Sequence, residues 1–347
     1  MQLLENLRIH SLFIGVFMED IFKDKTILLT GGTGSFGNKF VELLLKNHSP
    51  HSIRIYSRNE LKQIEMERKF ESDSRLRFFI GDVRDGSRLN RAMNGVNFVV
   101  HAAALKHVPV CEYNPMEAIK TNIDGAQNLI NAAIDNQVEK VVALSTDKAV
   151  EPANLYGATK MVAEKLFIQS NAYSGSRKTR FSCVRYGNVI GSSGSVVPLF
   201  KNQAKTGKIT LTDSRMTRFW ITLDQGVGLV KKAFSQMSGG EIFIPKIPST
   251  KITDLAQILA PNAKIDVIGM RAGEKLHEIL ITEEESRHTT ELDDHYLVLP
   301  ELNFWDKQKS PLKPNLKEGF SYSSDNNSWW LNQDEIKTLL KKEGWLN

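Results

Sequence analysis

The chain has 347 residues, of which 24% are charged and 41% hydrophobic, an ordinary globular composition. Its formal net charge is only +5, with acidic and basic residues interspersed, so nothing in the sequence argues for nucleic-acid binding. Two isolated cysteines, Cys111 and Cys183, are too few for a disulfide framework or a metal site and fit a reducing compartment. We expect a cytoplasmic protein with one large domain and a smaller one.

The first 23 residues are predicted to be an extension that precedes the fold. The apolar run 12–18 is too short to span a bilayer, and acidic residues follow it at once, so no membrane association is predicted. A signal peptide is not expected, because Glu5 offsets Arg8 and no small-residue cleavage site follows. Met18 stands just before the first predicted strand and is an alternative start.

Residues 25–30 are typical of a buried parallel strand, and a glycine turn and a helical pattern over residues 38–46 follow directly. The turn satisfies both spacings of the dinucleotide-binding glycines, in the strand–turn–helix context that this motif requires. Its glycines let the backbone approach a pyrophosphate at the helix N-terminus. The turn residues predicted to bind the cofactor are Gly31, Thr33, Gly34, Ser35, Phe36 and Gly37.

The end of the second predicted strand, residues 51–56, indicates which cofactor is bound. An NAD enzyme usually places Asp or Glu here to hold the ribose hydroxyls. This chain instead has Ser57, Arg58 and Asn59, with Lys62 one turn further along. Two cations and a small hydroxyl suit a 2′-phosphate, so the sequence predicts NADP.

Strands predicted over residues 76–80 and 97–100 end at the same edge of the sheet. The residues assigned to the cofactor after these strands are Asp82, Val83, Ala102 and Lys106, and Lys106 is also assigned to the substrate. His101 and His107 have no Cys or His partner at ligand spacing, so no metal site is predicted.

The strand predicted over residues 141–144 is followed by the most informative part of the chain. Tyr156 and Lys160 share one helix face if a helix begins near Tyr156. Such a pair suits proton transfer coupled to hydride transfer, because the ammonium favours the phenolate. Asp147 and Lys148 add an acid and a base that simple alcohol oxidation does not need, and this surplus indicates elimination chemistry.

Lys148 can act as a base only as a neutral amine. We expect burial next to Lys160 and the positive nicotinamide ring to lower its pKa from about 10.4. An ion pair between Asp147 and Lys148 is not expected, because adjacent residues of a strand point to opposite faces.

Beyond residue 185 the pattern changes from regular strand–helix alternation to shorter elements. Residues 181–188 are predicted to form a strand that delivers Asn188 to the cleft, and Arg271 lies in a polar loop, 271–278, that enters a helix and could clamp a diphosphate. The other predicted elements are strands over 209–212, 218–221 and 241–245 and a last helix near 333–342. The predicted fold is α/β, a Rossmann-type doubly wound parallel sheet with a smaller C-terminal α/β substrate domain. Its divisions are an extension (1–23), a cofactor domain (24–185), a predominantly substrate-binding domain (186–300) and a C-terminal segment (301–347).

These motifs resemble those of the extended short-chain dehydrogenases/reductases that modify nucleotide sugars. More narrowly, the chain resembles the inverting UDP-N-acetylglucosamine 4,6-dehydratases (5-epimerising), which begin pseudaminic acid synthesis for flagellin glycosylation in bacteria. The resemblance runs from about residue 24 to 330. The segments that carry it are Thr30–Gly37, Ser57–Lys62, Ala102–Val108, Leu144–Ala149, Leu155–Lys160, Arg185–Asn188, Met216–Thr222 and Gly273–Glu278.

The resemblance implies a role for each catalytic candidate. Tyr156, assisted by Lys160, would take the C4 hydroxyl proton while Thr146 hydrogen-bonds the C4 oxygen. Lys148 would remove the C5 proton and Asp147 would protonate the departing C6 hydroxyl. The implied NADP(H) is tightly held and recycled within each turnover, and a hexameric homo-oligomer is implied. The substrate contacts implied for UDP-N-acetylglucosamine are Lys106, Asn188, Thr217, Arg218, Arg271 and Glu274.

Position 148 separates the related enzymes. Retaining 4,6-dehydratases carry Thr-Asp-Glu where this chain has Thr146-Asp147-Lys148, and capsule-type inverting relatives usually lack the tyrosine found here as Tyr156. Departures from the family pattern are Asn59 in place of Asp and Ala272 in place of Pro, and neither removes a catalytic candidate. A capsule-type dehydratase, a C4 epimerase and a non-catalytic NADP-binding regulator remain alternatives. An epimerase has no use for the Asp147–Lys148 pair, and a regulator would be expected to have lost catalytic groups.

Overall fold

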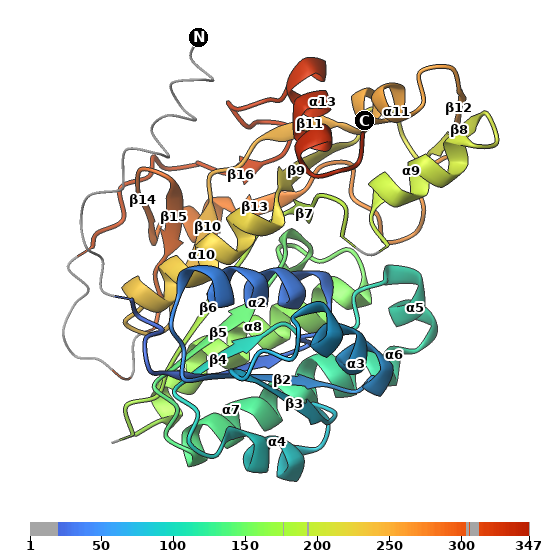
Figure 1. Ribbon diagram of the computed structural model, residues 1–347. Coiled ribbons are helices and arrows are strands. Elements are labelled where there is room, and N and C mark those ends of the chain that lie inside the picture. The colour runs from blue at the N-terminus through green and yellow to red at the C-terminus, as the bar shows by residue number, and fades with distance from the viewer. Residues whose placement is uncertain (1–19, 176, 193, 303–304, 306–311, 347) are drawn as a thin grey trace.

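The computed structural model describes residues 20–175, 177–192, 194–302, 305 and 312–346. Its centre is a nine-stranded sheet with the order β14-β15-β10-β6-β5-β4-β1-β2-β3 (Figure 1). The strands from β10 to β3 in this order run parallel to one another. At the other edge, β15 pairs antiparallel with β10, and β14 pairs antiparallel with β15. The strands of this sheet are β1 (Thr26–Thr30), β2 (Ser52–Ser57), β3 (Leu76–Ile80), β4 (Phe98–His101), β5 (Lys140–Leu144), β6 (Arg180–Val184), β10 (Ile242–Pro245), β14 (Thr289–Glu291) and β15 (His295–Val298).

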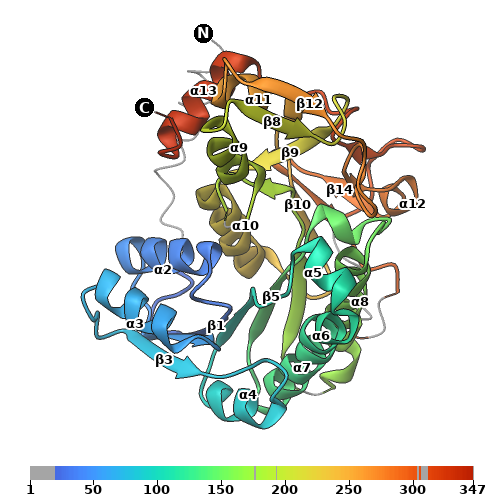
Figure 2. The ribbon, with the colours of Figure 1, turned by 90° about the vertical axis from the view of Figure 1, so that its right-hand side faces the viewer.

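Helices cover both faces of the sheet because its inner strands are apolar on both sides, as β1 with all five residues buried illustrates. Helices α2, α3 and α10 lie over one face and α4, α7 and α8 over the other (Figure 2). Their bounds are α2 (Ser35–Asn47), α3 (Glu60–Lys69), α4 (Gly86–Met93), α7 (Gly125–Asp135), α8 (Leu155–Tyr173) and α10 (Leu223–Gln236). Two short helices, α5 (Val108–Tyr113) and α6 (Pro115–Ile119), and a π-helical turn (Lys120–Asp124) link β4 to α7.

A second, smaller core lies beyond the carboxyl ends of the parallel strands, near the top of Figure 1. Outside the main sheet, the described strands form a three-stranded sheet, β11-β9-β7, and the pairs β8–β12 and β13–β16. The strands are β7 (Asn188–Val189), β8 (Lys208–Leu211), β9 (Thr217–Ile221), β11 (Ser249–Lys251), β12 (Lys264–Val267), β13 (Ile279–Ile281) and β16 (Tyr322–Ser323). The helices that follow residue 185, besides α10, are α9 (Val196–Ala204), α11 (Ile252–Leu259), α12 (Glu283–Ser286) and α13 (Gln333–Lys342).

The predicted fold class, a doubly wound Rossmann-type α/β fold, is confirmed. Segment 186–300 also supplies β10, β14 and β15 to the main sheet. The helix expected after the polar loop 271–278 is wrong: the loop leads into β13, which pairs with β16 more than forty residues further along. Residues 1–19 of the predicted extension lie outside the described residues. No helix in the described ranges is both long and apolar enough to cross a membrane.

A buried arginine joins the two regions. Arg185, which is 2% exposed, follows β6 and donates Nε to Glu164 Oε2 in α8 at 3.2 Å. Its two Nη atoms donate to the Glu285 carboxylate in α12, each at 2.8 Å, and Nη1 also donates to the Leu280 carbonyl in β13 at 2.8 Å. Bidentate pairing on both sides satisfies the guanidinium and fixes α8, β13 and α12 relative to one another.

Removing one of these carboxylates should be costly, because it leaves a buried guanidinium short of a partner. We expect Glu164→Gln to lower the free energy of unfolding by about 3–5 kcal/mol, measured by urea denaturation. The matched control is Glu42→Gln, which breaks the partly exposed Lys39–Glu42 pair and should cost no more than about 1 kcal/mol. Equal losses for the two variants would contradict this role of Arg185.

Candidate active site

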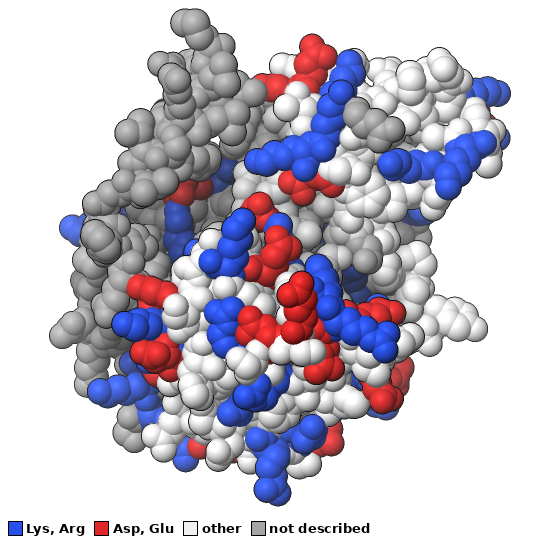
Figure 3. Space-filling model, in the orientation of Figure 1, with Lys and Arg blue, Asp and Glu red and all other residues white. Residues whose placement is uncertain are grey.

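A single cleft of about 770 Å³ opens at the carboxyl ends of β1, β2, β4 and β5, where a doubly wound sheet binds its ligands. Every residue predicted to bind the cofactor lines it, as do all five catalytic candidates. Two of the predicted substrate contacts, Lys106 and Asn188, also line it. On the face seen in Figure 3, acidic and basic side chains are interspersed, so this face carries no patch of a single sign over the Rossmann part.

The glycine turn is shaped for close approach by a ligand. Gly31 has φ +66°, and a Cβ there would lie 2.8 Å from the Ala103 nitrogen. A Cβ on Gly37 would lie 2.1 Å from the Gly32 oxygen, so only glycine lets α2 start this close to the turn. The N-cap residue of α2 is Gly34, which has no side chain to cap the helix, so no capping side chain meets the positive end of the helix dipole. These residues fit the pyrophosphate of a dinucleotide.

The residues after β2 combine structural and binding features. Asn59 caps α3 by accepting a hydrogen bond from the Lys62 nitrogen at 2.9 Å, and Ser57 Oγ accepts from Gln63 Nε2 at 3.0 Å. The Arg58 side chain is 55% exposed, with Nη1 3.8 Å from Asp82 Oδ2. Arg58 is therefore placed at the cleft with only a loose ion pair, and it can turn to a ligand without breaking a buried contact.

The loop after β4 is held in place by a residue that the sequence reading missed. Asn122, 1% exposed, lies in the π-helical turn. It accepts from the Leu105 nitrogen and donates to the Leu105 carbonyl, both at 2.9 Å, and also donates to Thr159. This turn, of a kind often found at functional sites, fixes the backbone that carries Lys106 to the cleft.

Tyr156 and Lys160 begin α8 and are both buried, on one face as predicted. Lys160 Nζ donates to the Leu144 carbonyl at the end of β5 at 2.7 Å, and burial lowers the pKa of Lys160. Burial raises the pKa of Tyr156 to about 12, and the nearby Lys148 charge and a hydrogen bond with Thr146 oppose that rise. Lys148 thus contributes a charge that favours the phenolate, in addition to the role that the sequence predicts for Lys160.

Two expectations for Asp147 and Lys148 are wrong. Lys148 Nζ donates to Asp147 Oδ1 at 3.1 Å, because residues 147–149 form a 3₁₀ turn rather than a strand and both side chains meet on one side. Burial alone would lower the pKa of Lys148, but the charges of Asp147 and Glu278 outweigh it and raise that pKa. Burial also raises the pKa of Asp147, against the opposing effect of Lys148.

Glu278 is the second residue that the sequence reading missed. It is 2% exposed, and its Oε1 lies 3.2 Å from Lys148 Nζ, so Lys148 pairs with two buried carboxylates. The signal was present in the sequence, since Glu278 is an acidic residue directly before the apolar run Ile279–Ile281. It was overlooked because a helix was expected there.

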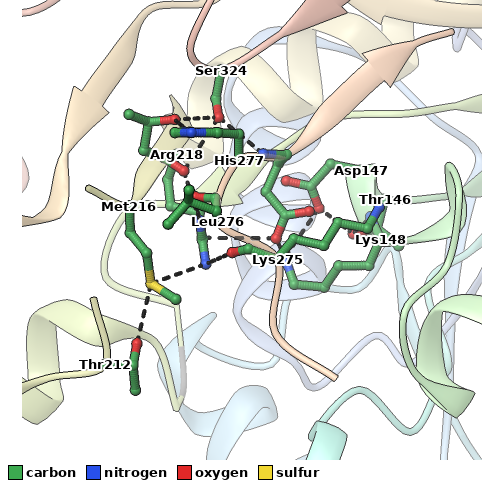
Figure 4. A network of polar contacts seen from close by, with 12 residues as sticks. Thr146, Asp147, Lys148, Thr212, Met216, Arg218, Lys275, Leu276, His277 and Ser324 are labelled. Carbon is green, nitrogen blue, oxygen red and sulfur yellow. Dashed lines mark hydrogen bonds and ion pairs between the residues drawn. The ribbon is translucent and has the colours of Figure 1, made fainter. Parts of the chain in front are cut away.

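Four predicted substrate contacts do not line the cleft: Thr217, Arg218, Arg271 and Glu274. Arg218 donates to the Lys275 and Leu276 carbonyls, each at 3.0 Å, and so supports the loop that leads to Glu278 (Figure 4). Arg271 is 56% exposed, with Nη1 3.9 Å from Glu274 Oε1. In the described part of the chain, no group of three or more acidic, His or Cys side chains is placed to hold a metal ion.

Residues 27–300 match a family described as polysaccharide biosynthesis protein, and the chain belongs to it. It is 54% identical to the UDP-N-acetylglucosamine 4,6-dehydratase (inverting) of Campylobacter jejuni, over 92% of this chain and 98% of that protein. It is also 44% identical to a UDP-glucose 4-epimerase of Rickettsia rickettsii, over 92% of this chain and 96% of that protein. The resemblance found in the motifs is confirmed, and the chain is an enzyme.

Solved structures agree on the fold. Pen from Bacillus thuringiensis superposes with a TM-score of 0.86 at 41% identity, covering 94% of this chain and 99% of that one. DesIV, a dTDP-glucose 4,6-dehydratase of Streptomyces venezuelae with NAD bound, gives a TM-score of 0.65 at 25% identity, covering 72% and 86%. The fold is therefore that of the extended short-chain dehydrogenases/reductases.

Arg58 should decide between the two nicotinamide cofactors. A charge-assisted hydrogen bond to a 2′-phosphate contributes roughly 1.5–3 kcal/mol, which NAD cannot gain. We expect Arg58→Ala to weaken NADP binding by that amount and to leave NAD binding nearly unchanged, as measured by calorimetric titration. Arg68→Ala, at the exposed far end of α3, is the control. An equal loss for NAD and NADP would assign Arg58 to structure.

Proposed function

We propose that this enzyme dehydrates UDP-N-acetylglucosamine across C5 and C6 after oxidation at C4, with inversion at C5. The product would be UDP-2-acetamido-2,6-dideoxy-β-L-arabino-hex-4-ulose. One observation carries the proposal: the cleft holds an acid–base pair, Asp147 and Lys148, in addition to the Tyr156 and Lys160 that an alcohol oxidation needs. The 54% identity to an inverting dehydratase supports the same reaction.

The residues present fit a nicotinamide dinucleotide, and NADP is the proposed form. Gly31 and Gly37 make room for its pyrophosphate, and Arg58 and Lys62 suit a 2′-phosphate. When bound, the cofactor supplies a hydride acceptor for C4 and returns the hydride to C6, so no net oxidation occurs. Lys160, fixed by the Leu144 carbonyl, stands at the floor of the cleft, where a fixed ammonium can orient a ribose or a phenol.

The protein side chains supply the proton transfers. Tyr156 takes the C4 hydroxyl proton as a phenolate. The resulting ketone acidifies the C5 hydrogen, and Lys148 removes it when the single proton that Asp147 and Lys148 share across their 3.1 Å hydrogen bond resides on Asp147. Asp147 protonates the C6 oxygen, which leaves as water. A proton from solvent then adds to the opposite face of C5 and inverts that centre, and Tyr156 returns the C4 hydroxyl proton to solvent. Burial favours a protonated Asp147 and therefore suits the role of acid.

A UDP-sugar 4-epimerase is the second candidate, because a 44% identical relative bears that name. An epimerase would use Tyr156 and Lys160 but would keep the C6 hydroxyl. The mass of the product separates the two reactions, since only dehydration lowers it by one water. A place at the start of pseudaminic acid synthesis for flagellin or another surface glycan, a cytoplasmic location and a homo-oligomer are further proposals that rest on the dehydratase function.

Lys148→Ala tests the base directly. Removal of a general base costs about 10²–10⁴-fold in turnover, and we expect that loss while calorimetric binding of UDP-N-acetylglucosamine is retained. Lys178→Ala, an exposed lysine in the loop after α8, serves as the control and should turn over normally. Near-normal turnover by Lys148→Ala would remove Lys148 from the mechanism.

The stereochemical course tests the remaining part of the proposal. Product made in D₂O should carry deuterium at C5, because the C5 proton is exchanged, whereas the hydrogen delivered to C6 should originate from C4 of the same substrate molecule. A retaining enzyme would also label C5, so the ring proton–proton couplings of early, unlabelled product decide. We expect the L-arabino configuration; a D-xylo product from the first turnovers would exclude inversion.

A further inference from the structure

Glu278 is a buried carboxylate behind the reactive pair, and its backbone is firmly held. Its nitrogen donates to Ser324 Oγ at 2.9 Å, and its carbonyl accepts from the Ser324 nitrogen at 2.8 Å. Its side chain does not line the cleft, so it reaches the reaction only through Lys148, 3.2 Å away. The second oxygen of Glu278 and the second oxygen of Asp147 are both buried without a hydrogen bond to the described part of the chain.

Four charged groups thus lie in a row: the Asp147 carboxylate, the Lys148 ammonium, the Glu278 carboxylate and the Arg218 guanidinium. Arg218 Nε lies 3.7 Å from Glu278 Oε1, a looser contact than that of Lys148. Three further titratable groups interact electrostatically with these charged groups. They are Tyr156 from α8, Lys106 from the loop after β4 and Lys275 from the loop before β13. Among these groups of the described part of the chain, Lys148 alone pairs with both carboxylates, at 3.1 Å with Asp147 and 3.2 Å with Glu278.

We propose that Glu278 is a positioning residue, which fixes Lys148 Nζ against Asp147 and sets the pH range over which the Asp147–Lys148 pair holds a single proton. The inference rests on the proposed dehydratase function. The geometry favours it because ion pairs with two buried carboxylates, at 3.1 and 3.2 Å, hold the lysine amine in its place beside Asp147.

The elimination requires one proton in the pair. Lys148 takes the C5 proton, so the C5–H bond breaks and an N–H bond forms. The electrons left at C5 form the C5–C6 double bond, the C6–O bond breaks, and Asp147 gives its proton to the leaving oxygen, which departs as water. Proton transfer from Lys148 to Asp147 across their 3.1 Å hydrogen bond then restores the starting state. A pair with two protons lacks the base, and a pair with none lacks the acid.

The charge of Glu278 acts in the same direction on both members. It raises the pKa of Lys148, where burial acts the other way, and it raises the pKa of Asp147, where burial is the larger cause. The single-proton range lies between these two titrations, which belong to the pair as a whole. Loss of the negative charge must therefore move both ends of that range to lower pH.

The test is the pH profile of kcat/KM for Glu278→Gln, which keeps the shape of the side chain and removes its charge. We expect both limbs to move to lower pH, by about one unit or more, because a charge about 4 Å away acts strongly even in a polarisable interior. Glu284→Gln, an exposed carboxylate in the same segment, is the control and should leave the profile in place. An unshifted profile for Glu278→Gln would overturn the inference.

If Glu278→Gln fails to fold, which thermal unfolding would reveal, a second variant tests the inference. Glu278→Asp keeps the negative charge but moves it away from Lys148. The limbs of the pH profile should therefore stay in place. The kcat should fall by about 10²-fold for a displacement of about 1 Å, with KM little changed. Wild-type kcat in Glu278→Asp would show that the position of this carboxylate does not matter and would overturn the inference.

A readout without turnover separates this inference from the dehydratase proposal. NMR titration of the Lys148 ammonium, assigned by its loss in Lys148→Met, should show a lower pKa in Glu278→Gln than in the wild type. No shift would overturn the inference even in an active dehydratase. Failure of the wild type to form a 4-keto product would instead refute the proposed function, whatever the titration shows.

Discussion

The active site depends on the contact between Arg185 and two carboxylates. Glu164 lies in the helix that carries Tyr156 and Lys160, and Glu285 follows the strand that Glu278 precedes. These parts of the site come from segments more than one hundred residues apart, and a buried guanidinium between them sets their separation. A buried charge is expensive to leave unpaired, so the arrangement resists displacement of β13 and α12 relative to α8.

Several lysines lie near Lys148 in the cleft. Burial lowers the pKa of a lysine and raises the pKa of a carboxyl group. Burial lowers the pKa of both Lys160 and Lys106. Lys148 departs from that behaviour because Asp147 and Glu278 flank it. Burial and neighbouring charges thus shift the pKa values of three lysines of one cleft in different directions.

Local patterns in the sequence predicted most of the Rossmann part, because each parallel strand is an apolar run and its functional residues follow within a few positions. The strand ends near Thr30, Ser57 and Leu144 and the helix that carries Tyr156 and Lys160 were found in this way. What failed depended on distant contacts or on short irregular backbone. The 3₁₀ turn at Asp147 was read as a strand, which placed two touching side chains on opposite faces. Glu278 was missed because its partner in space, Lys148, lies 130 positions earlier, and β10, β14 and β15 joined the main sheet through pairings that no local pattern encodes.

Gly157 has a consequence for how this chemistry can be moved between proteins. A Cβ at that position would lie 2.1 Å from the Lys148 carbonyl oxygen, so the start of α8 rests directly on the turn that carries the acid–base pair. The phenol and the pair are therefore one rigid unit rather than two neighbouring features. Grafting the Asp-Lys dipeptide into a related reductase with a larger residue after its tyrosine would push the helix away and separate the groups. A successful transplant has to carry the turn, the tyrosine and the glycine together.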